Sequence, residues 1–273
     1  MQKKDKRKQA KVKVLLLLSL LVVIFTLVAP YLAPNDPLKT DFTSILIEAN
    51  GKYPLGTDHI GRCTYSRLLY GARATLGTAF LLIVGISVVG VLIGSLAGFK
   101  GGALDTLIMR IGDVLLAFPD IVFAIIIVGM LGAGIVNTII ALSMIWWVKY
   151  ARLSRVLVKK ERNSDYAHAA RMVGAGEFKI YFYYIFPNIL PSLVVQISLN
   201  IGSIIIALAG FSFLGLGVQA PTPEWGNMLN EGRIYIQTEP HLLIYPGLCL
   251  FVVVLLFNTL GELLRSTLNQ KET

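Results

Sequence analysis

The chain has 273 residues, of which 55% are hydrophobic and 15% are charged, and its formal net charge is +9. So large a hydrophobic share excludes an ordinary soluble domain. The basic residues concentrate beside apolar runs, which favours a membrane topology signal over a nucleic-acid-binding surface.

The chain begins with a basic stretch, residues 1–13, and no charged residue then appears before Asp36. A helix needs about 20 apolar residues to cross a bilayer, so we predict a first transmembrane helix at residues 14–33. A cleaved signal peptide has the same two parts and is the alternative. The run is long for a signal peptide, and Pro30 directly after Ala29 disfavours cleavage.

Further charge-poor windows predict five more transmembrane helices, at residues 75–98, 107–131, 135–151, 190–211 and 243–263. We therefore expect an all-α membrane protein with six transmembrane helices. With a cytoplasmic N-terminus, the outward segments hold few of the 25 Lys and Arg residues, namely Lys39, Lys52, Arg62, Arg67, Arg73 and Arg233. This asymmetry follows the positive-inside rule and places both termini and residues 149–187 in the cytoplasm.

The two long outward segments differ in character. Residues 34–74 form an extracytoplasmic segment that opens with a turn signal, Pro34-Asn35-Asp36-Pro37, and residues 65–73 predict an interfacial helix. Residues 212–242 contain three prolines and predict a loop with at most short helices. Its acids and its histidine match no metal-ligand spacing, so we interpret them as a solvated loop: Glu224, Glu231, Glu239 and His241.

Two features inside the predicted spans point to packing or transport. Gly90, Gly94 and Gly98 recur every four residues, a small-residue stripe that lets another helix approach closely, within the chain or at a moving subunit interface. Asp120 follows Pro119 near the middle of the third span. A carboxylate there costs about 2.5–3.5 kcal/mol on insertion scales and is a candidate for the translocation path. The alternative is that a neighbouring helix satisfies it.

A polar stretch between the fourth and fifth spans is the most specific segment of the chain. Residues 166–170 favour a helix, Gly174 supplies a turn or helix C-cap, and a second helical run should end at Pro187 and Pro191. Two short helices meeting at a glycine on the cytoplasmic face form a docking surface. An amphipathic connector resting on the bilayer is the alternative.

This stretch resembles the EAA loop of bacterial ATP-binding-cassette (ABC) importer permeases. Ala169-Ala170, Gly174 and Pro187 stand at the positions of that motif, and His168 replaces its usual glutamate. Four other segments resemble the second permease subunit of the dipeptide, oligopeptide and nickel subfamily: LGTDHIGR at 55–62, SRLLYGAR at 66–73, FSFLGLG at 211–217 and PTPEWG at 221–226.

The resemblance implies a type I importer bundle. Its five-helix core would cover residues 75–263, with a cytoplasmic coupling loop at 152–189 and a cytoplasmic tail at 264–273. The loop would dock into an ATPase subunit through its small residues and their neighbours, Ala169, Ala170, Arg171, Gly174, Ala175 and Gly176.

The implied partners are a second permease subunit, two ATP-binding cassette ATPases, an extracytoplasmic solute-binding protein and the lipid bilayer of a bacterial cell. No G-x-x-x-x-G-K-[ST] motif is present, so ATP would be used by the partners, and we expect no cofactor, no enzymatic activity and no nucleic acid. A secondary transporter is a second class, disfavoured because no internal repeat is visible. An intramembrane enzyme is a third, disfavoured because no G-x-S-x-G motif occurs.

The cargo rests on the resemblance. The form G-T-D-H-x-G-R is similar to nickel-type members, so we expect nickel or a related chelated transition metal, with di- and oligopeptides as the alternative. We assign no metal site, and His59 is the one candidate metal contact. Cys249 lies in an apolar run, so we expect no disulfide with Cys63.

Overall fold

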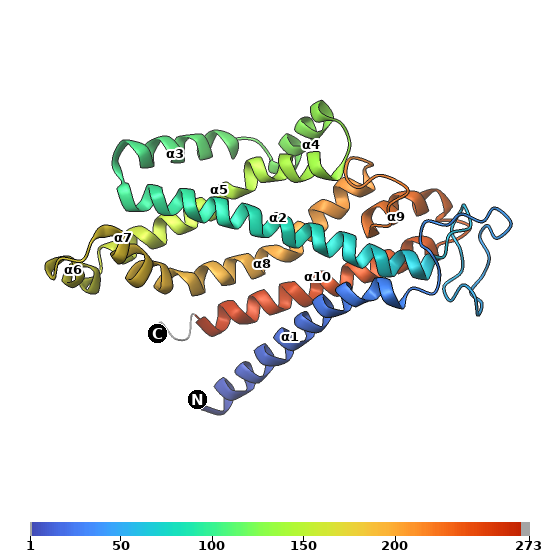
Figure 1. Cartoon of the computed structure of the whole chain (residues 1–273), viewed down its shortest axis with the longest axis horizontal. Coiled ribbons are helices and arrows are strands. Elements are labelled where there is room, and N and C mark those ends of the chain that lie inside the picture. Colours follow the sequence, from blue (N-terminus) through green and yellow to red (C-terminus); the bar gives the residue numbers. More distant parts are fainter. Residues whose placement is uncertain (1, 269–273) are drawn as a thin grey trace.

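The computed structural model describes residues 2–268, and its regular elements in that range are helices, with one isolated bridge between Thr57 and Cys63 (Figure 1). The long helices are α1 (Gln2–Val28), α2 (Thr64–Lys100), α5 (Ile135–Arg162), α8 (Phe186–Phe213) and α10 (His241–Leu268). The short ones are α3 (Gly102–Leu115), α4 (Asp120–Leu131), α6 (Asp165–Met172), α7 (Glu177–Lys179), α9 (Trp225–Gly232) and the helical turns η1 (Ala29–Leu32), η2 (Ile180–Ile185) and η3 (Arg233–Tyr235). The predicted all-α class is confirmed. Met1 and residues 269–273, parts of the predicted N-terminal stretch and tail, lie outside the described residues.

The centre of the bundle is formed by α2, α5 and α8, which bury apolar side chains against one another. Ile86 of α2, Leu142 of α5 and Ile205 of α8 are almost fully buried in one cluster. Because lipid tails are as apolar as these side chains, close packing between helices holds such a bundle together. α10 packs closely against α8, because a Cβ built on Gly261 of α10 would lie 2.9 Å from the Cα of Leu199 of α8.

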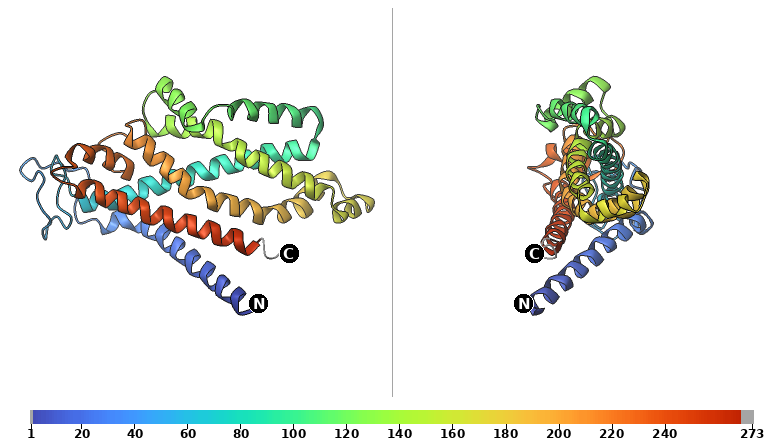
Figure 2. Two further views of the ribbon diagram at one scale, coloured as in Figure 1. Left: turned by 180° about the vertical axis from the view of Figure 1, so that it is seen from behind. Right: turned by 90° about the vertical axis from the view of Figure 1, so that its left-hand side faces the viewer.

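The two ends of the molecule differ. The starting end of α1, the final end of α10 and the α6–α7 segment lie toward one end, and residues 33–63 and α9 lie at the other (Figure 1). α1 runs beside α10 near this second end and diverges from the bundle toward its own start (Figure 2). Most apolar side chains of α1 are consequently exposed in the single chain.

The predicted third span is not one helix. It is broken between Leu115 and Asp120, and the two helices on either side, α3 and α4, meet at 82°. Pro119 has no backbone N–H, and it disfavours helical geometry at the residue before it. The sequence predicted one continuous span over residues 107–131, whereas the helix breaks before Pro119 and Asp120 opens a new helix.

Within residues 2–268, four helices are long and apolar enough to cross a membrane: Val12–Leu32, Thr64–Lys100, Glu177–Phe213 and His241–Thr267. The bent α3–α4 pair would make a fifth. α5 is not among them, and its second half carries Lys149, Arg152 and Arg155. The predicted count of six spans is therefore not confirmed.

Two further expectations about helix limits are wrong. Residues 65–73 are no interfacial helix, because they form the first turns of α2 and are largely buried beneath α9. There, Trp225 Nε1 donates to the Leu68 carbonyl at 3.0 Å. Neither Pro187 nor Pro191 ends a helix: Pro187 lies in the first turn of α8, where a missing N–H is tolerated, and Pro191 lies inside it.

Candidate functional site

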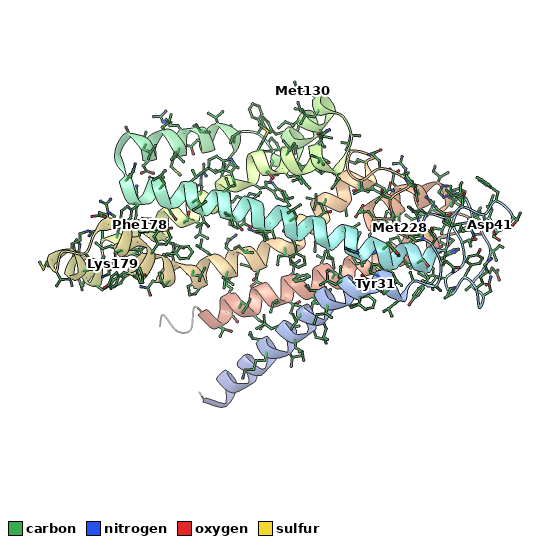
Figure 3. The ribbon with its side chains drawn as sticks, viewed as in Figure 1. Tyr31, Asp41, Met130, Phe178, Lys179 and Met228 are labelled. Carbon is green, nitrogen blue, oxygen red and sulfur yellow. The ribbon has the colours of Figure 1, made fainter. Side chains whose placement is uncertain are left out.

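The polar stretch forms a compact projection at one end of the bundle. Figure 3 shows Phe178 and Lys179 there, with Asp41 at the opposite end of the molecule. α6 supplies one short helix, and α7 leads through η2 into α8 without a break. The projection therefore joins two long helices, α5 before it and α8 after it.

Gly174 ends α6 in a left-handed conformation, with φ of +82°. The N–H of Ala175 donates to the Ala170 carbonyl at 3.0 Å, and the N–H of Gly174 donates to the Arg171 carbonyl at 3.0 Å. These two bonds are the pattern of a Schellman C-cap, which favours glycine because a Cβ strains this conformation. The turn predicted at Gly174 is confirmed.

A separate hydrophobic cluster fixes the projection to the bundle. Ala167 and Ala170 of α6 are buried, and so are Val158 of α5 and Ile189 of α8. Ile180, Ile185 and Leu193 complete the buried set. The cluster therefore ties the position of α6 to the positions of α5 and α8.

Polar contacts add to this anchoring. Arg171 Nη1 donates to the Arg162 carbonyl at 3.1 Å, and Arg171 Nε lies 3.4 Å from Glu177. The Tyr166 hydroxyl donates to the Glu161 carboxylate. Burial raises the pKa of Tyr166, and the hydrogen bond to Glu161 adds to that effect.

Large apolar side chains cover the outer surface of the projection. Met172 is 89% exposed, Val173 84% and Phe178 76%. Met172 and Val173 are neighbours in the chain beside Gly174, and Phe178 also lines the groove against α2, so apolar surface is available on two sides of the projection. Sequence reasoning missed these three side chains, although their position on either side of Gly174 was available as a signal.

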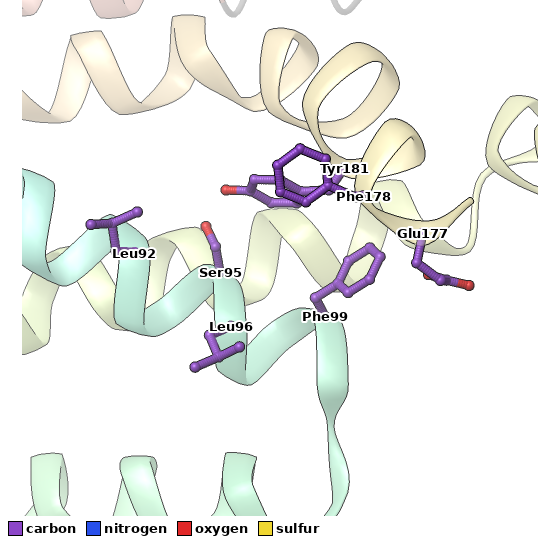
Figure 4. A pocket seen from close by; sticks show the side chains of 7 residues that line it. All are labelled: Leu92, Ser95, Leu96, Phe99, Glu177, Phe178 and Tyr181. Carbon is purple, nitrogen blue, oxygen red and sulfur yellow. The ribbon is translucent and has the colours of Figure 1, made fainter. Parts of the chain in front are cut away.

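A groove lies where the projection meets α2. Its volume is ≈ 280 Å³, and its lining is Leu92, Ser95, Leu96, Phe99, Glu177, Phe178 and Tyr181 (Figure 4). The aromatic rings of Phe99 and Tyr181 meet edge to face, with centroids 5.8 Å apart. Through this ring contact the projection also packs against α2, a third long helix.

The predicted coupling residues differ in how far their side chains are buried. Ala169, Gly174 and Gly176 are exposed at the surface of the projection, whereas Ala170 is buried. Arg171 and Ala175 are partly buried. The buried and partly buried members lie where they support the projection, and the exposed ones lie beside Met172 and Val173.

The glycine stripe of α2 faces α5 of the same chain. A Cβ built on Gly90 would lie 2.6 Å from Tyr150 Cβ, and one on Gly98 would lie 2.7 Å from the Arg155 carbonyl oxygen. At Gly94 the nearest atoms are the Ala151 carbonyl and the Ser154 hydroxyl. At all three positions the contact is too short for a real Cβ, so within this chain the stripe sets how closely α2 and α5 approach.

Asp120 lies at the start of α4 with its side chain 33% exposed. Its Oδ2 accepts from Trp146 Nε1 at 3.0 Å and from Lys149 Nζ at 3.1 Å. A neighbouring helix, α5, therefore satisfies the carboxylate, which is the alternative stated for Asp120, and its place in the translocation path stays a prediction. The carboxylate is paired with a partly exposed lysine of α5.

The opposite end of the molecule holds a buried network of charges. Arg62 and Arg67 are each 1% exposed, and both donate to Glu231 Oε2, at 2.8 and 2.6 Å. Arg62 also pairs with Asp58 at 2.6 Å. Glu224 is buried as well, and it accepts from the Thr75 hydroxyl and caps α9. Reading Glu224 and Glu231 as a solvated loop was wrong, because tertiary partners bury them.

His59 lies in this network. Ligand atoms of Asp58, His59 and Glu231 lie within 4.8 Å of one another, and the His59 ring stacks on Tyr235. Both carboxylates already accept from guanidinium groups, whose positive charge opposes a bound cation. These three side chains are therefore better suited to an internal ion-pair network than to a metal site. Both cysteines are free, as expected.

Comparison with known proteins gives matches over most of the chain. Residues 90–273 match the family model described as "Binding-protein-dependent transport system inner membrane component". The nickel transport system permease protein NikC of Escherichia coli K12 is 38% identical over 258 residues, covering 94% of this chain and 93% of that relative.

Two further relatives are named for the transport of other solutes. The di/tripeptide transport system permease protein DppC of Pseudomonas aeruginosa UCBPP-PA14 is 41% identical over 262 residues, covering 94% of this chain and 86% of that protein. The glutathione transport system permease protein GsiD of Pectobacterium atrosepticum is 40% identical over 254 residues, covering 92% and 84%.

Among solved structures, an inward-facing form of the MetNI methionine ABC transporter matches with a TM-score of 0.56. The match covers 73% of this chain and 95% of that chain at 19% identity. At this identity the likeness supports the fold alone.

Proposed function

Because the chain belongs to the family of binding-protein-dependent inner-membrane transport components, in its nickel and peptide branch, we propose that it forms half of the membrane pathway of an ATP-driven importer. It is a permease subunit of an ABC importer, a multi-pass protein of the bacterial inner membrane. A second permease completes the pathway, and an extracytoplasmic binding protein delivers the solute.

The observation that carries this proposal is the anchored projection at one end of the bundle. Its exposed apolar surface next to Gly174 provides a contact face for an ATPase subunit, and its buried cluster connects that face to α5 and α8. ATP binding and hydrolysis in two partner ATPases would then move the long helices against each other. Both termini and the projection would be cytoplasmic.

We propose nickel or a related chelated transition metal as the cargo. The relative named for nickel aligns with 94% of this chain, and the G-T-D-H-x-G-R form at 56–62 supports the same choice. The second candidate is a di- or oligopeptide, favoured by the 41% identity to a di/tripeptide permease. His59 remains the candidate contact for metal, although the paired carboxylates around it do not favour a bound cation.

Two experiments test these proposals separately. Purification of the tagged chain from membranes in mild detergent should recover a second permease and an ATPase with a phosphate loop, and recovery of the chain alone would refute the assembly. Deletion of the gene should lower cellular nickel in metal-poor medium, and excess nickel should restore growth. Unchanged nickel together with lost growth on dipeptides would refute the metal and leave the permease.

A further inference from the structure

A small cavity with a mixed polar and apolar lining lies between three helices of the bundle, away from the projection and from the buried charges at the other end. Its volume is ≈ 90 Å³, and three helices, α2, α5 and α8, contribute its walls. The lining consists of Ile86, Trp146, Lys149, Tyr150, Asn200, Ser203 and Ile204. The volume equals that of about three water molecules at ~30 Å³ each, which is room for one carboxylate group.

The cavity lies well inside the bundle. At a rise of ~1.5 Å per residue, Lys149 is about 21 Å from the start of α5, and Asn200 is about 21 Å from the start of α8. Polar side chains at such depth usually line a water-filled path or a protein contact. Asn200 Nδ2 donates to the Tyr150 hydroxyl at 3.0 Å, so the polar character extends from α5 to α8.

Lys149 is the charged member of the lining, and it is half exposed. Its side chain is 48% exposed, its Nζ lies 5.3 Å from the Trp146 ring centroid, and its acidic partner is Asp120. A charged lysine halfway along α5, beside the apolar core of the bundle, is unfavourable against lipid. The pair therefore requires water, a partner subunit or a solute on its open side.

The two members of the pair differ in how firmly they are held. Asp120 accepts from Trp146 Nε1 at 3.0 Å and from the Ile121 N–H at 3.0 Å in addition to Lys149. It also lies at the start of α4, where the helix dipole stabilises negative charge. Asp120 therefore keeps its partners when Lys149 moves, and Lys149 can exchange one carboxylate for another.

On the basis of the permease function proposed above, we propose that Lys149 contacts the solute in transit and that this solute carries a carboxylate. Lys149 Nζ leaves Asp120 for the carboxylate of the passing solute and returns when the solute has left. A peptide carries such a group at its C-terminus, and a metal carries one when chelated by a carboxylic acid. A bare divalent cation is repelled by the lysine.

The test uses the complete importer, purified with its partners and reconstituted in vesicles with ATP. Three probes are offered: a labelled dipeptide, Ni²⁺ with citrate, and Ni²⁺ alone. The measured quantities are probe accumulated and ATP hydrolysed. Lys149→Met is compared with Lys149→Arg, which keeps the charge, and with Arg152→Met, which breaks the neighbouring exposed pair between α5 and Asp113 of α3.

We expect the native importer to accumulate the dipeptide or the citrate complex and not Ni²⁺ alone. Loss of a charge-assisted contact should lower the accumulation of Lys149→Met roughly tenfold to hundredfold, while its ATP hydrolysis and subunit recovery match the native importer. Lys149→Arg should restore most of the uptake, and Arg152→Met should behave as native. If Lys149→Met fails to assemble, Lys149→Gln, which retains a polar group, replaces it in the same comparison.

Several outcomes overturn the inference. Unchanged uptake in Lys149→Met, or equal loss in Arg152→Met, would show that Lys149 does not contact the solute. Native accumulation of Ni²⁺ alone would refute the carboxylate. If the purified chain brings no ATPase and no second permease, the proposed function fails and this inference fails with it, whereas an assembled, active importer with an indifferent Lys149 refutes this inference alone.

Discussion

Gly94→Ala should destabilise the chain, although alanine is the better helix former. A Cβ at Gly94 would lie 2.6 Å from the Ala151 carbonyl carbon of α5, and contacts below 3.0 Å are essentially never seen. The helices must therefore separate. Because two of the three nearest atoms belong to the Ala151 backbone carbonyl, rotation of the Ser154 side chain alone does not relieve the overlap.

The magnitude follows from two opposing effects. Overpacking typically costs about 1–3 kcal/mol, and replacing glycine by alanine in a helix contributes about 1 kcal/mol in the other direction. We expect a net loss of up to about 2 kcal/mol. For a chain of this size, 1 kcal/mol lowers the melting temperature by roughly 2–4 °C.

The chain offers a matched control on the same helix. Gly85 of α2 has no atom within 4 Å of a built Cβ, so Gly85→Ala should gain the helix propensity without the overlap. Thermal unfolding of both variants in the same detergent gives the comparison. A melting temperature that rises equally in Gly94→Ala and Gly85→Ala would show that α2 and α5 do not meet at this glycine.

Two more perturbations test the ends of the molecule. Gly174→Asp should leave membrane insertion intact while abolishing ATPase recovery and uptake. The control is Gly101→Asp, because Gly101 has a similar φ of +69° and open space around it. Equal ATPase recovery with both variants would refute the docking role of Gly174. Glu231→Gln removes the negative charge that pairs with two buried arginines, so it should lower the free energy of unfolding by about 3 kcal/mol. The control is Glu262→Gln, whose carboxylate is 66% exposed, and the Glu231 variant should melt at the lower temperature. Equal melting temperatures would contradict this account.

Much of the projection could be predicted from the sequence, because its signals are local. Gly174 favours a left-handed turn wherever a helix ends, and its two capping bonds involve residues within five positions. The anchoring of the projection was not predictable in the same way. Ala167 and Ala170 are buried only because Val158 and Ile189, from two other helices, pack over them.

The sequence by itself determined the all-α class, the family and the four apolar helices that overlap the predicted spans 14–33, 75–98, 190–211 and 243–263, since hydrophobic runs and motifs are read along the chain. Only the tertiary structure decided which charged residues pair with one another. Asp120 and Lys149 are 29 positions apart, and Arg67 and Glu231 are 164 apart. A charge inside a bundle is stable only beside its partner, and folding brings that partner from a distant segment; the sequence therefore marks the charge but not what satisfies it.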